Sequence, residues 1–97
     1  MMSQIRVTPS ELKDVARQYD NESQQVTDII GRLDRMRDHL TGIWEGSSSE
    51  AFVGQYEELK PSFMDMARLL NEVSQQLHKS AQILEDTDNQ IASQIRG

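Results

Sequence analysis

The segment LTGIWEGSSSE, residues 40–50, decides the fold because it interrupts two long stretches of periodic apolar residues. Gly42 and Gly46 bracket the interruption. Ser47-Ser48-Ser49-Glu50 then has the composition of a helix start, in which a serine caps the first turn and a glutamate closes the capping box. The sequence therefore predicts that the chain folds back on itself at Trp44-Glu45-Gly46, and so short a connection requires two antiparallel helices.

The stretch before this turn predicts a helix over about residues 8–43. Thr8-Pro9-Ser10-Glu11 provides a cap, a proline suited to the first helical position and a glutamate that closes a capping box. Apolar residues then recur at heptad spacing, which is typical of helices that pack side by side. One heptad position holds Leu12, Tyr19, Val26, Leu33 and Leu40, and the other holds Val15, Glu22, Ile29, Met36 and Ile43.

The stretch after the turn predicts a second helix over about residues 48–93. One of its heptad positions holds Phe52, Leu59, Met66 and Val73, and the other holds Tyr56, Phe63, Leu70, Leu77, Leu84 and Ile91. Pro61 lies within this pattern and removes one backbone hydrogen bond, so a kink is expected there. The last residues, 93–97, are expected to fray.

These patterns predict one all-α domain over residues 1–97, with the turn at about 44–47. The fold is an antiparallel two-helix hairpin that pairs into a four-helix bundle as a homodimer. The apolar stripes are wider than one seam can bury, since further apolar residues, among them Ala16, Ile30, Ala67 and Ala81, broaden them. The predicted dimer and core seam consists of Leu33, Leu40, Phe52, Tyr56, Leu59, Phe63 and Leu70.

The overall composition excludes several classes of partner. The net charge of −6 and the lack of a basic stripe argue against nucleic acid and against anionic membrane surfaces. The chain has no cysteine, so disulfides and thiolate zinc sites are excluded. Residues 1–11 lack the apolar core of a secretory signal, and no stretch has the apolar length of a membrane span.

Residues that could carry chemistry have simpler explanations. His39 and His78 are far apart in sequence and are expected to face solvent, and the serines at 47–49 lack a nearby base and are expected to cap a helix. Glu85, Asp86 and Asp88 lack the glycine turn of a calcium loop. We therefore expect no enzymatic activity, no metal, no cofactor and no small-molecule ligand.

Two features are not explained by packing alone. Trp44 is the single tryptophan and lies at the turn, where it either caps the end of the core or anchors a partner. Leu84, Asp88, Ile91 and Ile95 share one helical face through spacings of four, three and four. Asp88 interrupts that face, either as a polar residue that sets the register or ends the helix, or as part of a patch that a partner recognises.

A chain of about a hundred residues with Trp44-Glu45-Gly46 between two heptad-patterned helices resembles the WXG-motif (Esx) family of type VII secretion substrates. The resemblance covers essentially the whole chain. It implies export from Gram-positive cells as a folded dimer, without a cleaved signal and after a cytoplasmic pool. In such a dimer the Trp-x-Gly turn of one chain lies near the C-terminal tail of the other. Carried over here, that composite export signal consists of Trp44 and Gly46 with Leu84, Asp88, Ile91 and Ile95.

The resemblance also implies partners. They are a second copy of the chain, an FtsK/SpoIIIE-like membrane ATPase and other helical-hairpin substrates, in a virulence-associated system. Actinobacterial members often carry Tyr-x-x-x-Asp/Glu after the second helix, but here Tyr19 precedes Ser23 and Tyr56 precedes Lys60 at that spacing. The chain therefore looks like the Bacillota branch, in which homodimers are usual. The alternative is a cytoplasmic helical adaptor or chaperone for a larger secreted toxin.

Overall fold

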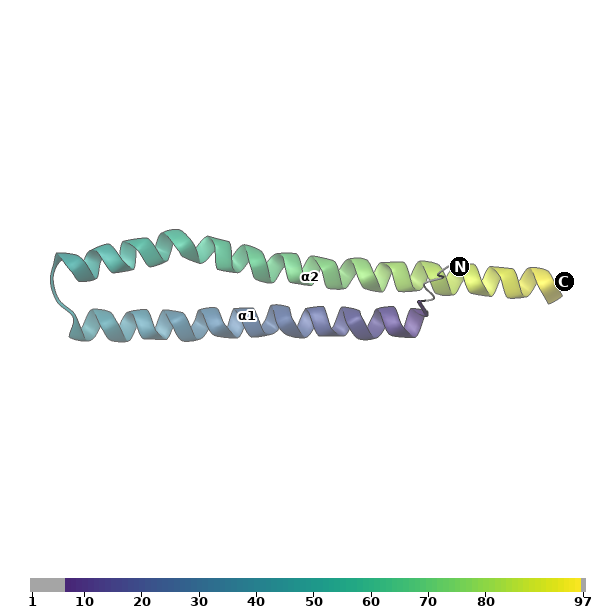
Figure 1. Cartoon of the computed structure of the whole chain (residues 1–97), viewed down its shortest axis with the longest axis horizontal. Coiled ribbons are helices and arrows are strands. Elements are labelled where there is room, and N and C mark those ends of the chain that lie inside the picture. The colour runs from purple at the N-terminus through teal and green to yellow at the C-terminus, as the bar shows by residue number, and fades with distance from the viewer. Residues whose placement is uncertain (1–6, 97) are drawn as a thin grey trace, which may run out of the picture.

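A computed structural model of the chain describes residues 7–96, and the side chains of residues 7–95. Two helices, α1 (Pro9–Ile43) and α2 (Ser47–Arg96), lie side by side in opposite directions. Figure 1 shows the turn at one end of this hairpin and α2 continuing past the start of α1 at the other. The predicted all-α antiparallel hairpin is confirmed. Residues 1–6, part of the segment searched for a secretory signal, lie outside the described residues.

The start of α1 is fixed by the capping box that the sequence predicts. Thr8 has extended backbone angles, φ −92° and ψ 156°. Its Oγ1 accepts a hydrogen bond of 3.1 Å from the Glu11 amide, and the Glu11 carboxylate accepts one of 3.2 Å from the Thr8 amide. Two amides that no helical carbonyl can reach are thereby satisfied, which defines where the helix begins.

The second helix is longer than the sequence pattern indicated. It continues to Arg96, three residues beyond the predicted end at residue 93, so residues 93–96 of the segment expected to fray are helical. The last residue of that segment, Gly97, lies outside the described residues. Residues 62–96 contain neither glycine nor proline, and nothing in their composition ends a helix before Gly97.

Small side chains form the line of closest contact between the helices. Ala16 and Ala81 have no exposed surface, Ser74 is 3% exposed, and the Ser23 hydroxyl donates a 2.7 Å hydrogen bond to the Ala67 carbonyl. The sequence pattern placed the three alanines at the edges of wider apolar stripes. The structure places them at the centre of the hairpin seam, because a methyl group lets two helix backbones approach more closely than a leucine does.

Near the turn, larger side chains occupy the space between the helices. Tyr56 is 9% exposed and Phe63 is half-buried. Pro61 lies inside α2, and Figure 1 shows that α2 bows away from α1 in its teal and blue-green part before converging on it again. The expected kink is therefore present, and it gives room to the aromatic rings on either side of it.

The hairpin is one layer thick and has little interior. Its principal extents are 77 × 27 × 15 Å. Among the described residues, no large side chain is fully buried. The accessible surface is 7517 Å², whereas a compact monomer of 11.1 kDa exposes roughly 5,700 Å². A single chain therefore leaves roughly 1,800 Å² more surface in water than a globular protein of its mass.

Candidate functional site

The turn joins the helices through three residues. Trp44 ends α1 with extended angles, and its amide donates a 2.8 Å hydrogen bond to the Leu40 carbonyl. Gly46 has φ +108°, a conformation that L side chains rarely adopt, and its carbonyl accepts hydrogen bonds from Ser49 and Glu50. Gly46 thus stands immediately before the first residue of α2.

This geometry corrects one prediction. The sequence pattern indicated that Ser47 caps the second helix in a box with Glu50. Instead Ser47 is already helical, and Gly46 occupies the cap position. The physical reason is the sharp reversal of the chain, because only glycine adopts the required positive φ without strain, and the helix can then start at the next residue.

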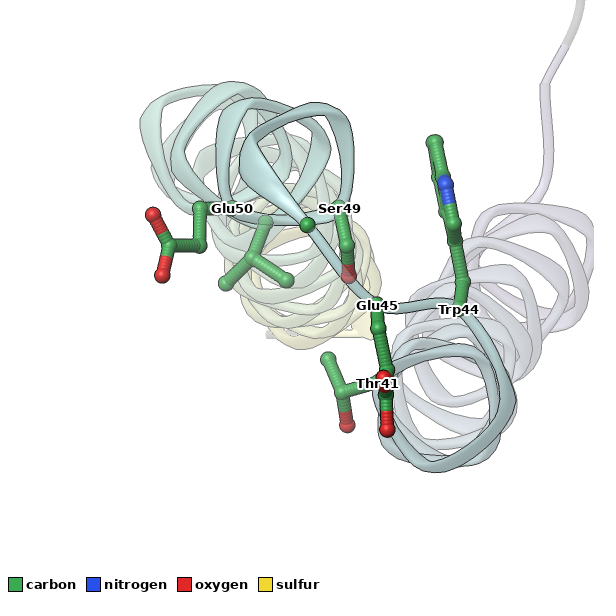
Figure 2. A pocket seen from close by; sticks show the side chains of 7 residues that line it. Thr41, Trp44, Glu45, Ser49 and Glu50 are labelled. Atoms are coloured by element: carbon green, nitrogen blue, oxygen red, sulfur yellow. The ribbon is translucent and has the colours of Figure 1, made fainter.

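Trp44 lies on one side of the turn with its indole partly in water. The side chain is 37% exposed, and its ring centroid lies 5.9 Å from that of Phe52 at an interplanar angle of 46°. Figure 2 shows the indole projecting from one side of the hairpin, while Thr41 and Glu50 project from the other. These residues border a hollow of about 410 Å³ at the turn. Both roles considered for Trp44, capping and anchoring, are compatible with this position.

The edge of the hairpin on the side of Thr41 and Glu50 is polar, and hydrogen bonds and ion pairs join the two helices along it. Nearest the turn, Asp34 accepts hydrogen bonds from the Tyr56 hydroxyl at 2.7 Å and from the Lys60 ammonium at 3.0 Å. Arg37 pairs with Glu57, and its guanidinium lies 5.5 Å from the centre of the Tyr56 ring. This turn network, consisting of Asp34, Arg37, Tyr56, Glu57 and Lys60, ties α1 to α2 where their backbones are farthest apart.

The hydrogen-bonded pair of Asp34 and Tyr56 in the turn network has displaced pKa values. The hydrogen bond from Tyr56, followed by that from Lys60, lowers the pKa of Asp34 because both stabilise the carboxylate. Burial, followed by the hydrogen bond to Asp34, raises the pKa of Tyr56. Both shifts favour the pair of states in which the carboxylate is charged and the phenol keeps its proton.

The same polar edge continues away from the turn. Asn71 donates a 3.1 Å hydrogen bond to Asp20, and Lys13 lies 3.1 Å from Glu85. These cross-helix pairs were not predicted from the sequence, because they depend on the register between the helices. The recurrence of charged residues on one heptad line, Lys13, Asp20 and Asp34, was the available signal.

The opposite edge of the seam is apolar and open. In an antiparallel pair, the positions just before the seam residues of both helices lie on the same side, and here these are positions such as Val15, Ile29, Met66 and Val73. We call this side the open apolar face. Its exposed members are Val15, Tyr19, Ile29, Met36, Ile43, Phe52, Leu59, Met66 and Ile91. The rings of Trp44 and Phe52 pack in a tilted arrangement at its turn end.

The seven residues of the predicted dimer and core seam divide between the seam within one chain and the open apolar face. Tyr56 is buried, and four others are half-buried along the edge of the open apolar face: Leu33, Leu40, Phe63 and Leu70. Phe52 and Leu59 are exposed, at 36% and 48%. The heptad pattern identified these residues as apolar packing positions but did not separate the seam within one chain from the face that one chain leaves uncovered.

The predicted C-terminal recognition residues lie at the far end of α2. Leu84 is half-buried beside the start of α1. Asp88, Ile91 and Ile95 are exposed, and Ile95 is 80% exposed. Asp88 lies seven residues after Ala81 and therefore on the side of α2 that packs against α1 in the rest of the hairpin. At Asp88 this side of α2 has reached the first turn of α1, and beyond it α1 no longer covers α2.

A single chain does not bring the two halves of the predicted signal together. Trp44 and Gly46 lie at the turn, whereas Asp88 and Ile95 lie near the opposite end of a 77 Å long molecule (Figure 1). Any site that contains both must be formed by two chains.

Other candidate residues lie apart from one another. His39 and His78 are both exposed, and Ser49 is buried at the turn beside Gly46. Glu85 is engaged by Lys13. Within residues 7–96, no group of three or more histidine, cysteine, aspartate or glutamate side chains is arranged to hold a metal ion. Over the same part of the chain, neither helix has a stretch long and apolar enough to cross a membrane.

Comparison with known proteins gives concordant matches. Residues 4–89 match the model of the family described as WXG100, proteins of 100 residues with WXG. The chain is 56% identical over 97 residues to protein YukE of Bacillus subtilis, and the match covers the whole of both chains. It is 29% identical over 92 residues to type VII secretion system extracellular protein A of Staphylococcus aureus, covering 95% of each chain.

A crystal structure has the same fold. EsxA of Geobacillus thermodenitrificans superposes with a TM-score of 0.86 at 69% sequence identity. The alignment covers 94% of this chain and 100% of that chain.

Proposed function

Since the chain belongs to the WXG100 family, we propose that it is a substrate of a bacterial type VII secretion system that leaves the cell as a folded homodimer. Members of this family are non-enzymatic, and the prediction that the chain is not an enzyme is thereby confirmed. We propose that it acts by presenting a surface that other proteins recognise.

The proposed homodimer is supported by the surface that one chain leaves open. The excess of roughly 1,800 Å² per chain over a compact monomer exceeds the roughly 800 Å² that each partner buries in a standard interface. Large apolar side chains line the open apolar face along both helices, whereas the opposite edge carries the cross-helix ion pairs. At about 25 cal/mol per Å², covering such a face with a second copy is strongly favourable.

The observation that carries the composite signal is the placement of the turn and the tail at opposite ends of the chain. If two hairpins pair in reversed orientation, Trp44 and Gly46 of one copy lie beside Leu84, Asp88, Ile91 and Ile95 of the other. The exposed indole of Trp44 and the overhanging face of α2 would then form one continuous patch. Two such patches exist in each dimer, one at either end.

The proposed reader of this patch is the FtsK/SpoIIIE-like membrane ATPase of the secretion machine. The patch combines an aromatic anchor with aliphatic side chains and one carboxylate, a composition that suits a specific protein contact. The relative in Staphylococcus aureus is named as an extracellular protein of such a system. Export without a cleavable signal, from a cytoplasmic pool, follows from recognition of a folded surface.

Secretion measured in cells that carry a type VII system tests the proposal. Trp44→Ala and Asp88→Ala are each expected to abolish recovery of the protein from the medium while light scattering still reports a dimer. Glu45→Ala and Asn89→Ala are matched controls, because they alter neighbouring residues outside the proposed patch. Circular dichroism of each purified variant verifies that the hairpin folds.

Co-expression of the two defective chains gives a sharper test. A mixed dimer of one Trp44→Ala chain and one Asp88→Ala chain carries one patch with both changes and one patch with neither. Export of the mixed dimer is therefore expected to recover, although neither variant is exported alone. Normal export of either single variant, or failure of the mixed dimer to recover, would contradict the composite signal. Recovery in the cytosol alone, bound to a larger protein, would favour the adaptor role.

A further inference from the structure

The turn end of the hairpin is strongly acidic, whereas charges of both signs are interspersed along the rest of the chain. From residue 38 to residue 59 the sequence has five carboxylates and neither lysine nor arginine. The nearest cations along the chain, Arg37 and Lys60, are engaged in the turn network. The C-terminal end of α1 and the N-terminal end of α2 meet here with partial charges of opposite sign, which offset each other. The carboxylates therefore determine the potential around the turn.

Two of these carboxylates border the hollow of about 410 Å³ at the turn. Glu45 comes from the turn itself and Glu50 from the first turn of α2, and both residues are exposed. Among the described side chains, neither carboxylate forms an ion pair. Because water solvates exposed carboxylates well, these two acids alone do not define a binding site.

Ser49 provides an independent indication of a ligand. This residue is 6% exposed and borders the same hollow. Its amide bonds to the Gly46 carbonyl, but among the described residues its hydroxyl has no hydrogen-bond partner. Figure 2 shows the Ser49 oxygen directed from α2 toward the space between the helices. A hydroxyl that is so nearly buried is costly to leave unpaired, and a partner can reach it through the hollow.

The groups around the hollow favour an organic cation. Within residues 7–96, no group of three or more histidine, cysteine, aspartate or glutamate side chains is arranged to hold a metal ion. A guanidinium group suits the hollow better, because its five N–H donors spread in one plane and reach acceptors that lie apart. A lysine ammonium is compact and more strongly hydrated, so it engages fewer of these acceptors. Val53, which is half-buried, supplies apolar surface for the stem of an arginine side chain.

The hollow stays accessible when the proposed homodimer forms. Thr41 and Glu50, which border it, project from the side of the hairpin opposite the open apolar face that a second copy would cover (Figure 2). Glu45, Ser49 and Glu50 also lie outside the residues of the proposed export signal. A ligand can therefore reach the hollow in a single chain and in a dimer, with one site on each chain.

We propose that the hollow at the turn binds an arginine side chain presented by another protein. The Glu45 and Glu50 carboxylates accept hydrogen bonds from the guanidinium group, and the Ser49 hydroxyl accepts a further one. Val53 packs against the stem of the arginine. The hydrogen bonds to the two carboxylates are charge-assisted, which makes them shorter and stronger than bonds between neutral groups. The site gives the chain a second recognition surface, which lies beside the composite export signal and is independent of it.

Nuclear magnetic resonance of the isotope-labelled, full-length chain tests the site, with N-acetyl-arginine amide as the probe. The backbone amide signals of Gly46, Ser49 and Glu50 are expected to shift and to saturate, while those of residues 9–27 stay in place. N-acetyl-lysine amide carries the same charge and is expected to have a dissociation constant roughly threefold higher or more. Shifts that spread over the acidic residues of both helices without saturating would overturn the proposal, and so would equal affinity for the two probes.

Substitutions separate the site from the general acidity of the chain. Glu50→Gln is expected to raise the dissociation constant of the arginine probe roughly fivefold or more, because an ionised acceptor is lost. Glu58→Gln is the matched control, since Glu58 is exposed on the same helix and does not border the hollow. Ser49→Ala removes only the hydroxyl and is expected to raise the dissociation constant roughly threefold. Equal weakening by the Glu50 and Glu58 variants would show that only net charge matters and would overturn the site.

The secretion experiment separates this proposal from the proposed function. Glu45→Ala, a control in that experiment, is expected to weaken binding of the arginine probe about as much as Glu50→Gln while its export is unchanged. If the probe does not bind to the original chain, the arginine site is wrong and the proposed export signal stands. If Glu45→Ala binds the probe weakly and is also not exported, the hollow belongs to the export signal and its independence is refuted.

Discussion

The two halves of the hairpin hold their helices together in different ways. In the far half, residues 9–27 of α1 and 65–85 of α2, contact runs through alanine and serine, and the Ser23 hydroxyl bonds directly to the Ala67 carbonyl. In the turn half, residues 28–43 and 47–64, an aromatic ring and the turn network span a wider gap beside Pro61.

The difference shows that a sustained heptad pattern does not imply uniform packing. Small side chains in the far half determine how closely the backbones approach, so bulk is poorly tolerated there. In the turn half, hydrogen bonds and ion pairs between long side chains maintain contact across a bowed helix. The first solution depends on shape and the second on charge, so they should respond to different perturbations.

Added bulk in the far half should have the largest effect. Ala81→Leu is expected to lower the free energy of unfolding by about 1–3 kcal/mol, because Ala81 has no exposed surface and the helices must separate to admit the larger side chain. Thermal unfolding followed by circular dichroism measures this. Ala92→Leu, at an exposed position of the same helix, serves as the control. Equal stability of the two variants would refute the close seam.

Straightening the turn half should have a smaller effect of opposite sign. Pro61→Ala restores one backbone donor and is expected to raise the free energy of unfolding by about 1 kcal/mol. That is less than the roughly 3 kcal/mol cost of a proline in a helix interior, because Tyr56 and Phe63 still hold the helices apart. Urea unfolding measures the change. A gain of the full amount would show that the proline alone causes the bow.

Loss of one hydroxyl tests the turn network. Tyr56→Phe keeps the ring but removes the 2.7 Å hydrogen bond to Asp34, and is expected to lower the melting temperature by roughly 2–5 °C. Tyr19→Phe is the matched control, since Tyr19 lies in the far half and is exposed. An unchanged melting temperature for Tyr56→Phe would mean that the ring, and not its hydroxyl, joins the helices there.

The smallest effect is expected from pH. The pKa of Asp34 is lowered in the folded chain, so its stabilising contribution is present above the unfolded-state pKa of about 4 and is lost as the pH falls through the lower folded value. Melting temperatures from pH 7 to pH 2 should therefore show Asp34→Asn below the original chain at neutral pH and level with it at the acid end. A constant difference over this range would exclude Asp34 as the titrating group.

Local signals made much of the fold predictable. Thr8 and Glu11 form the predicted capping box because both partners lie within one turn of helix. The reversal at Trp44-Glu45-Gly46 was predicted because the apolar periodicity of both stretches stops there. The cap of α2 was not, because a serine box and a glycine with positive φ compete at adjacent positions, and the sharpness of the turn decides between them.

The division of the apolar residues between seam and open face was not predictable from hydrophobicity. Leu33 and Leu40 have the stronger pattern, yet Ala16 and Ala81 lie at the centre of the seam. The heptad recurrence of small residues at 16 and 23, and at 67, 74 and 81, was the available signal. The placement of Trp44 and Asp88 at opposite ends of the chain followed from the hairpin itself. Export and the recognition patch are proposals that the secretion experiments test.

The thinness of the hairpin links the proposed homodimer to concentration. No large side chain among the described residues is fully buried, so in the proposed homodimer the second copy completes the interior, and stability rises with the concentration of the chain. Each tenfold dilution removes about 1.4 kcal/mol from the dimer. Under the proposed export, copies that accumulate in the cytoplasm favour the folded dimer, and dilution into the surrounding medium destabilises it. The affinity of the proposed homodimer would then set how far the protein can be diluted before it unfolds.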